Sequence, residues 1–204
     1  MRLTLLEQWL LSLGRLGRWQ RTRLPARRYS RVALGLFFSL VVSLAEAQTP
    51  KEYRIKAAFL YNFAKFVEWP AQCFASGEAP IVIGVLGKNP FGDELDKIVA
   101  GRKLNGREIT VRIIETAADL PSVNLVFVGA GEEVRMLDKV QPSQRMGILT
   151  VGESKPFKSR GGMITFTADG DKVRFEINQG SAEQAGLKIS AQLLKLATAV
   201  EKKN

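Results

Sequence analysis

The chain has 204 residues, with 30 Lys and Arg against 20 Asp and Glu, one Cys and no His. Without His it cannot form a Ser-His-Asp triad, a Cys-His nucleophile or a His-ligated zinc or haem site, and a single Cys excludes an intrachain disulfide. The length and the 46% of apolar residues suit one folded domain. The formal charge of +10 points to nucleic acid or an anionic membrane as a partner until that charge is located.

Most of the excess charge lies in the first 47 residues. Residues 1–31 carry eight Arg and one acid, Glu7, and the uncharged apolar run Val32–Leu44 follows. Ala45 and Ala47 then provide the small side chains that a signal peptidase requires. Residues 1–47 are therefore predicted to be a secretory signal peptide with a long basic n-region, cleaved after Ala47. The alternative is an uncleaved membrane anchor with its Arg-rich side inside.

The remaining chain, residues 48–204, is only mildly basic. It holds 22 basic and 18 acidic residues, and no basic run is interleaved with aromatic residues. Nucleic acid is therefore not an expected partner. We expect residues 48–204 to form one domain in the periplasm.

Glu52–Glu68 is predicted to be an amphipathic helix that ends before Pro70. The face predicted to be buried consists of Ile55, Ala58, Phe59, Asn62, Phe63, Phe66 and Val67. An aromatic stripe of this kind could line a ligand pocket, but packing in the core is the favoured interpretation.

The middle of the chain alternates between apolar runs and helical segments. Short continuous apolar runs, typical of strands buried on both faces, occur at residues 80–87, 124–129 and 148–151. A turn at Asn89–Asp93 is expected to lead into a helix that ends at about Ala100. A second helix is expected at 132–140, and an extended strand at 108–114. This order predicts an α/β domain whose mixed, mostly parallel central sheet is flanked by helices.

The last third of the chain predicts antiparallel structure. Met163–Thr167 and Lys172–Ile177 flank the turn sequence Ala168–Asp171, which indicates a hairpin. A final helix is expected from Ser190, and its predicted buried face consists of Leu193, Leu196, Ala197 and Val200.

No motif for catalysis, a cofactor or a metal is present. The spacing of Gly84, Gly87 and Gly92 matches neither the dinucleotide fingerprint nor the P-loop. The carboxylates stand mostly at helix starts and turns, where acids cap the backbone. We expect a protein that is not an enzyme. The lone Cys73 is either a buried apolar filler, which we favour, or an exposed thiol open to intermolecular pairing.

The loop Ser154–Gly162 is the best candidate for partner binding. It places Phe157 among cations that include Lys158 and Arg160. An aromatic side chain among cations on a loop can anchor a protein partner. The alternative is a solvated loop whose Phe157 packs against the sheet.

Four stretches of this sequence resemble the YfiR family of periplasmic proteins. They are KAAFLYNFAKFVEWP, IVIGVLGKNPFGDEL, LTVGESKPF with RGGMITF, and VRFEINQGSAEQAGLKISAQLLKLA, and the resemblance runs from about Tyr53 to Val200. It implies a regulator that inhibits an inner-membrane diguanylate cyclase by contact and so modulates cyclic-di-GMP signalling and biofilm formation. It also implies an outer-membrane lipoprotein that relieves the inhibition, and a homodimer.

One departure from the family concerns redox control. Relatives often carry paired cysteines, one of them where Val123-Asn124 stands here, so redox control through Cys73 is not carried over.

The alternative function is a periplasmic small-molecule receptor or accessory solute-binding component. It would use a pocket beside the helix that carries Phe59 and Phe63.

Overall fold

The computed structural model describes residues 49–132 and 147–202. The signal-peptide prediction, with Ala45 and Ala47, and nearly all of the helix predicted at 132–140 lie outside the described residues. Within them, no helix combines the length and the apolar character that a membrane crossing requires.

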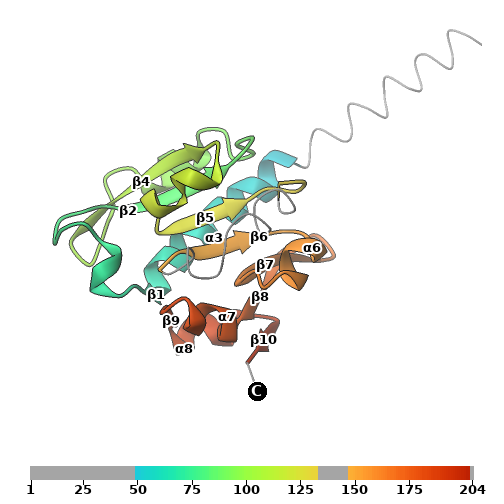
Figure 1. Cartoon of the computed structure of the whole chain (residues 1–204). Helices are drawn as coiled ribbons and strands as arrows, with labels where there is room; N and C mark the ends of the chain where they lie inside the picture. The colour runs from blue at the N-terminus through green and yellow to red at the C-terminus, as the bar shows by residue number, and fades with distance from the viewer. Residues whose placement is uncertain (1–48, 133–146, 203–204) are drawn as a thin grey trace, which may run out of the picture. The chain divides into compact units, whose positions relative to one another are not determined.

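A central sheet of eight strands organises the domain (Figure 1). In order across the sheet the strands are β10 (Ala199–Glu201), β8 (Lys172–Asn178), β7 (Ile164–Asp169), β6 (Leu149–Gly152), β5 (Leu125–Val128), β2 (Ile81–Leu86), β4 (Arg107–Ile114) and β3 (Lys103–Leu104). Strands β4, β2, β5, β6 and β7 pair in parallel, whereas β8 is antiparallel to β7 and β3 is antiparallel to β4. The predicted single α/β domain with a mixed, mostly parallel sheet and a separate hairpin is confirmed.

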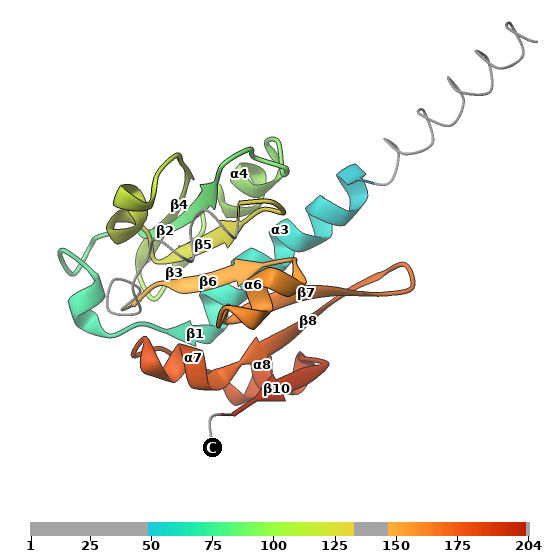
Figure 2. The same ribbon diagram turned by 45° about the vertical axis from the view of Figure 1, so that its right-hand side comes forward.

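The side-chain pattern of each strand matches its place in the sheet. Every residue of β2, β5 and β6 is buried, as expected of parallel strands covered on both faces. In β8, by contrast, buried Phe175 and Ile177 alternate with more exposed residues, and Phe175 pairs with Phe166 of β7. The hairpin prediction is therefore confirmed, and Figure 2 shows the hairpin tip projecting beyond the end of β6.

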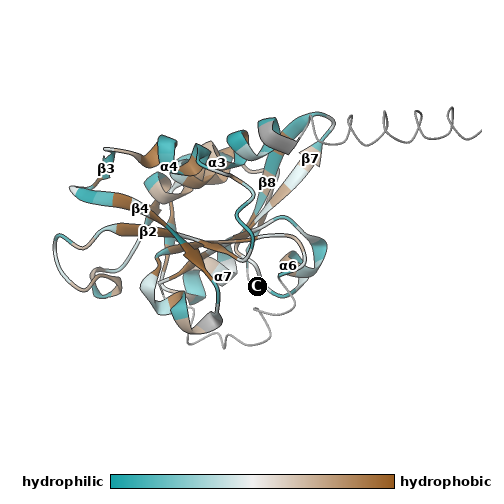
Figure 3. Cartoon of the chain, turned by 90° about the horizontal axis from the view of Figure 1, so that it is seen from above, coloured by the Kyte–Doolittle hydropathy of each residue, from teal (hydrophilic) through white to brown (hydrophobic). Residues whose placement is uncertain are grey.

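Helices α3 (Thr49–Phe66) and α4 (Glu94–Val99) cover one face of the sheet (Figure 3). The buried face of α3 is rotated relative to the prediction, because it consists of Lys56, Ala57, Leu60, Phe63 and Ala64. Ala58 is exposed, and Phe59 is only half-buried, with its ring stacked beside that of Phe63 at 5.9 Å between centroids. The aromatic spacing thus identified the helix correctly but placed its buried face one residue off.

The opposite face of the sheet is covered by shorter elements. Helix η3 (Ala117–Ser122) contributes Leu120 and helix α6 (Lys155–Ser159) contributes Phe157 to a second apolar cluster. The cluster also contains Val82, Leu86, Ile114, Val123, Val126, Val128 and Ile148 from the sheet and its connections. The remaining elements are η2 (Ala71–Cys73), α7 (Gln179–Gln184), α8 (Ala191–Leu196), and β1 (Val67–Glu68) paired with β9 (Lys188–Ile189).

The predicted last helix is too long. Helix α8 ends at Leu196, which is 59% exposed rather than buried, and Ala199–Glu201 forms β10, parallel to β8. The physical reason is a non-local contact with β8: both the amide and the hydroxyl of Thr198 donate to the carbonyl of Phe175, at 2.9 and 3.0 Å. These bonds draw the chain out of the helix and onto the edge of the sheet.

Candidate functional site

The predicted partner-binding loop is a short helix fixed to the sheet. The side chain of Ser154 caps α6 by accepting a hydrogen bond from the Phe157 amide at 3.1 Å. Phe157 is fully buried, and a side chain at Gly152 or Gly162 would collide with its ring. Of the two interpretations of Phe157, the exposed docking anchor is therefore wrong, and the ring packs in the core beside the sheet as the alternative expected.

Two of the three cations of this loop, Lys158 and Arg160, lie at the surface with partners of their own. Lys158 Nζ forms ion pairs with Glu176 at 2.7 Å and Glu201 at 2.9 Å, and hydrogen bonds to both carboxylates raise the pKa of Lys158. Arg160 is exposed, and one of its guanidinium N–H groups donates to the carbonyl of Pro156 at 3.4 Å. A role for Lys158 and Arg160 in partner contact stays a prediction.

A buried charged group that the sequence did not reveal lies at the carboxyl end of β6. We call Tyr53, Lys56, Ala130 and Glu153 the carboxyl-end cluster. Lys56 Nζ lies 2.5 Å from Glu153 Oε2, and only 7% and 10% of these two side chains are exposed. Glu153 Oε1 accepts hydrogen bonds from the Tyr53 hydroxyl at 3.0 Å and from the Ala130 amide at 3.3 Å. The carboxylate thus joins α3, the end of β5 and the end of β6.

The local sequence explains how the cluster assembles. Tyr53 and Lys56 are three residues apart on α3 and therefore lie on one helix face. Glu153 follows β6 directly, and Ala130 follows β5, so both come from the same edge of the parallel sheet. Lys56 also pairs with Glu52 at 2.6 Å, and its ammonium lies 4.7 Å from the centre of the Tyr53 ring. Burying this lysine is feasible because its charge is compensated.

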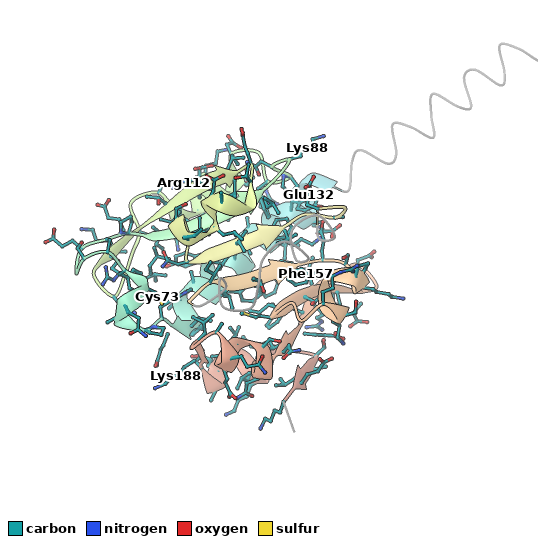
Figure 4. All side chains as sticks on the ribbon, viewed as in Figure 1. Cys73, Lys88, Arg112, Glu132, Phe157 and Lys188 are labelled. Carbon is teal, nitrogen blue, oxygen red and sulfur yellow. The ribbon has the colours of Figure 1, made fainter. Side chains whose placement is uncertain are left out.

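Two cavities meet at this cluster, and Tyr53, Ala130 and Glu153 line both. The larger, of about 1110 Å³, lies between the first turns of α3, the start of α6 and the β7–β8 hairpin. The smaller, of about 730 Å³, is lined by the segment after β2, including Lys88, and by the segment after β5, including Glu132. Figure 4 labels Lys88 and Glu132 at this end of the sheet.

The smaller cavity occupies a topological switch point. Strand β2 lies between β4 and β5, so the chain leaves β2 toward one side and later returns to its other side. In open α/β sheets, ligands bind in the crevice outside the carboxyl ends of the strands at such a point. The alternative prediction of a pocket beside the first helix is thus partly matched. The cavity lies beside Tyr53 at the start of α3, and not beside Phe59 and Phe63. Phe63 lies in the core instead.

Burial and ion pairing set the charges of the cluster. Burial and the adjacent Glu153 carboxylate raise the pKa of Tyr53 well above its ordinary value of 10.0, so the phenol stays neutral. Lys56 and Glu153 neutralise each other, so neither is a free nucleophile or base. Among residues 49–132 and 147–202, no group of His, Cys, Asp and Glu is arranged to hold a metal ion. The cluster can hold a hydrogen-bonding ligand in place.

Cys73 lies apart from the cluster, at the end of η2. Its thiol is half-buried and free, and burial raises its pKa. The sulfur packs so closely against Gly147 that a Cβ on Gly147 would lie 2.1 Å from it. The favoured expectation of a buried thiol is therefore only partly met.

Sequence reasoning missed Lys56 and Glu153, although a signal was present. Lys56 lies four and seven residues before Leu60 and Phe63, on the helix face that is in fact buried, and Glu153 directly follows a fully buried strand. A charge at either position is unusual without a partner, because burying an unpaired charge is costly.

Two solved structures resemble part of this fold weakly. One is an ABC domain in complex with L-Trp from Streptococcus pneumoniae, with a TM-score of 0.40 and 13% identity over 59% of this chain and 55% of that one. The other is a conserved domain protein from Vibrio cholerae O1 biovar eltor, with a TM-score of 0.39 and 15% identity over 59% and 54%. The chain thus spans about half the length of each structure. No curated protein matches the chain.

A family model gives a much more extensive match. The model described as YfiR/HmsC-like covers residues 53–198, from the first turns of α3 to the residue before β10. It therefore includes the whole carboxyl-end cluster, helix α6 and all strands of the central sheet except β10. The chain belongs to the YfiR/HmsC-like family of periplasmic regulators of cyclic-di-GMP signalling.

Proposed function

We propose that this chain inhibits an inner-membrane diguanylate cyclase by binding the periplasmic sensor region of that enzyme. Less cyclic-di-GMP is then made, and biofilm formation is disfavoured. The observation that carries the proposal is the extent of the family match, which includes nearly every element of the described fold. Export by the N-terminal signal peptide, relief of inhibition by an outer-membrane lipoprotein, and a homodimeric state belong to the same proposal.

The chemistry of the described residues supports binding rather than catalysis. The most buried charges, Lys56 and Glu153, are ion-paired with each other, and Tyr53 is held as a neutral hydrogen-bond donor. Nucleophilic catalysis needs a nucleophile activated by a neighbouring base, and these groups are occupied in holding α3 to the sheet. We therefore propose that the chain is not an enzyme and acts through its surface.

Deletion of the gene, followed by measurement of cellular cyclic-di-GMP by mass spectrometry, tests the proposed function. We expect the level to rise in the deletion strain and to return when the wild-type chain is supplied. Supplying Gly77→Ala should restore it equally, because a Cβ on the exposed Gly77 meets no atom within 4 Å. An unchanged level after deletion would contradict inhibition of a cyclase.

Physical contact needs a separate measurement. The tagged full chain, cross-linked in intact cells, should retain a membrane protein that carries a diguanylate cyclase domain. Retention should be lost when the periplasmic region of that cyclase is deleted, and persistence of the contact would contradict the proposed binding mode.

The two cavities favour a second candidate function, the binding of a small periplasmic solute. Ligand pockets commonly enclose about 300–1000 Å³ and combine apolar walls with a few polar groups. A panel of metabolites should then include one that raises the melting temperature of the full chain, since a ligand at 100 times its Kd stabilises by about 2.7 kcal/mol. Lys56→Met should weaken that shift. A panel without any effect contradicts this function.

A further inference from the structure

The outer edge of β4 is open along much of its length. Strand β3 pairs with β4 only through Lys103 opposite Glu108 and Leu104 opposite Arg107. On the other side, β2 pairs with every residue of β4 from Ile109 to Ile114. Within the described ranges no strand lies beside residues 110–114 on the outer side. We call residues 110–114 the open edge.

In the open edge, the backbone N–H and C=O groups of two residues point away from the sheet. The Gly87 amide donates to the Ile114 carbonyl at 3.0 Å, so the backbone groups of Ile114 face β2. In a strand these groups alternate in direction, so Arg112 also faces β2 while Val111 and Ile113 face away from it. An unpaired row of N–H and C=O groups is a template for pairing with another strand.

Two adjacent side chains of the open edge, Arg112 and Ile113, are exposed. Ile113 is 47% exposed, although neighbouring Ile114 is fully buried in the second apolar cluster. Arg112 is exposed, and among residues 49–132 and 147–202 no acid pairs with it. Arg107 on the same strand differs, since it donates to the carbonyls of Ser76 and Ala79. Figure 4 labels Arg112 on β4.

Charge decides which kind of strand fits the open edge. A second copy of this chain that pairs antiparallel through both outward residues would place its Val111 opposite Ile113. The two Arg112 side chains would then stand directly opposite each other, and like charges in that position are destabilising. An acidic side chain opposite Arg112 would instead form an attractive cross-strand pair. The open edge therefore disfavours self-pairing and favours a strand of opposite charge.

We propose that the open edge of β4 binds an extended segment of a partner protein by β-strand addition. The segment runs antiparallel to β4, exchanges backbone hydrogen bonds with Val111 and Ile113, and places an acidic side chain opposite Arg112. Its apolar side chains cover Ile113. Main-chain bonds supply affinity and the alternate side chains supply specificity in this mode of recognition. Only the identity of the partner, the sensor region of the cyclase, rests on the proposed function.

The direct test uses the full chain and a capped synthetic peptide, Ser-Thr-Val-Glu-Val-Thr-Ser, at saturating concentration. Hydrogen exchange followed by NMR should show slower exchange of the Val111 and Ile113 amides when the peptide is present. A matched peptide with Lys in place of Glu should bind about tenfold more weakly. Arg112→Glu should reverse this preference without lowering the melting temperature, because Arg112 has no partner to lose within the described part of the chain.

Every other outcome overturns the inference. Absence of protection at Val111 and Ile113 means that the edge does not accept a strand. Equal protection by the two peptides means that Arg112 does not select for acid. Protection of the same amides without peptide, increasing with protein concentration, shows that a second copy occupies the edge.

A cellular experiment separates this inference from the proposed function. If deletion raises cyclic-di-GMP, Arg112→Glu should raise it as well, with the protein present at its normal level. Full repression by Arg112→Glu would overturn the role of the edge in binding the cyclase and leave the proposed function intact. If deletion itself has no effect, the proposed function fails, and the peptide experiment still decides whether the edge accepts an acidic strand.

Discussion

Lys56 and Glu153 are 97 residues apart in sequence, yet their side chains form a buried ion pair with 2.5 Å between Nζ and Oε2. The pair fastens the second turn of α3 to the end of β6. Because the same carboxylate accepts hydrogen bonds from Tyr53 and Ala130, it connects α3, the segment after β5 and the end of β6. One carboxylate therefore fixes the first two turns of α3 to the sheet, while Leu60 and Phe63 pack the rest of the helix into the core.

Breaking this ion pair should destabilise the protein strongly. Lys56→Met leaves the Glu153 carboxylate buried without its cation, and removal of one partner of a buried pair costs about 3 kcal/mol. Urea denaturation followed by circular dichroism measures the loss. The double variant Lys56→Met/Glu153→Leu should recover much of the stability, because it removes both buried charges. A loss from Lys56→Met well below about 1 kcal/mol would show that water solvates the carboxylate.

Phe157→Ala should lower the free energy of unfolding of the domain while leaving its surface unchanged. The ring is fully buried, and truncation of such a ring costs about 3–5 kcal/mol. The matched variant Lys158→Ala removes only surface ion pairs with Glu176 and Glu201 and should cost less than about 1 kcal/mol. Chemical denaturation of both variants checks the difference. Equal losses would contradict the burial of Phe157.

Gly162→Ala should be destabilising by about 1–3 kcal/mol, because a Cβ there would lie 2.1 Å from the edge of the Phe157 ring. Gly77→Ala is the control, since the space around Gly77 is empty to 4 Å. Melting temperatures of the two variants test the prediction. If both variants melt at the wild-type temperature, the ring does not pack against Gly162.

Stability should fall as the solution becomes alkaline. The pKa of Tyr53 is raised above 10.0 by burial and by the Glu153 charge, so above pH 10 the unfolded chain loses this proton more readily than the folded chain. The stabilisation that the protonated Tyr53 hydroxyl contributes is complete below pH 10 and is lost as the pH rises through the raised pKa of Tyr53. Unfolding free energies from about pH 9 to about pH 11 should fall less steeply in Tyr53→Phe. Part of the decline should remain, since the pKa of Lys158 is also raised.

Local sequence signals were sufficient for most of the sheet. The apolar runs that form β2, β5 and β6 predict buried strands without any knowledge of their neighbours. The end of the chain was mispredicted, because Leu193 and Leu196 suggest a continuing helix whereas Thr198 finds a hydrogen-bond partner on β8. The competing interaction is non-local, so helical periodicity cannot detect it.

The candidate site was harder to predict than the fold. The positions of Lys56 and Glu153 make sense only once α3 lies across the end of β6. Phe157 shows the opposite problem, since three nearby cations made it look like part of a binding loop while two glycines provided space for its ring. The strand at Arg107–Ile114 was predicted closely, but strand order across the sheet decides that it has an open side.

The position of β2 between β4 and β5 also has a consequence for how the chain folds. Strand β2 is complete only when residues 125–128 have joined it, although β4 pairs with it first along the sequence. Parallel pairing between distant segments requires loop closure before any stabilising contact forms, and such topologies fold slowly. The first helix and β2 therefore remain without their full set of neighbours until much of the chain has been synthesised.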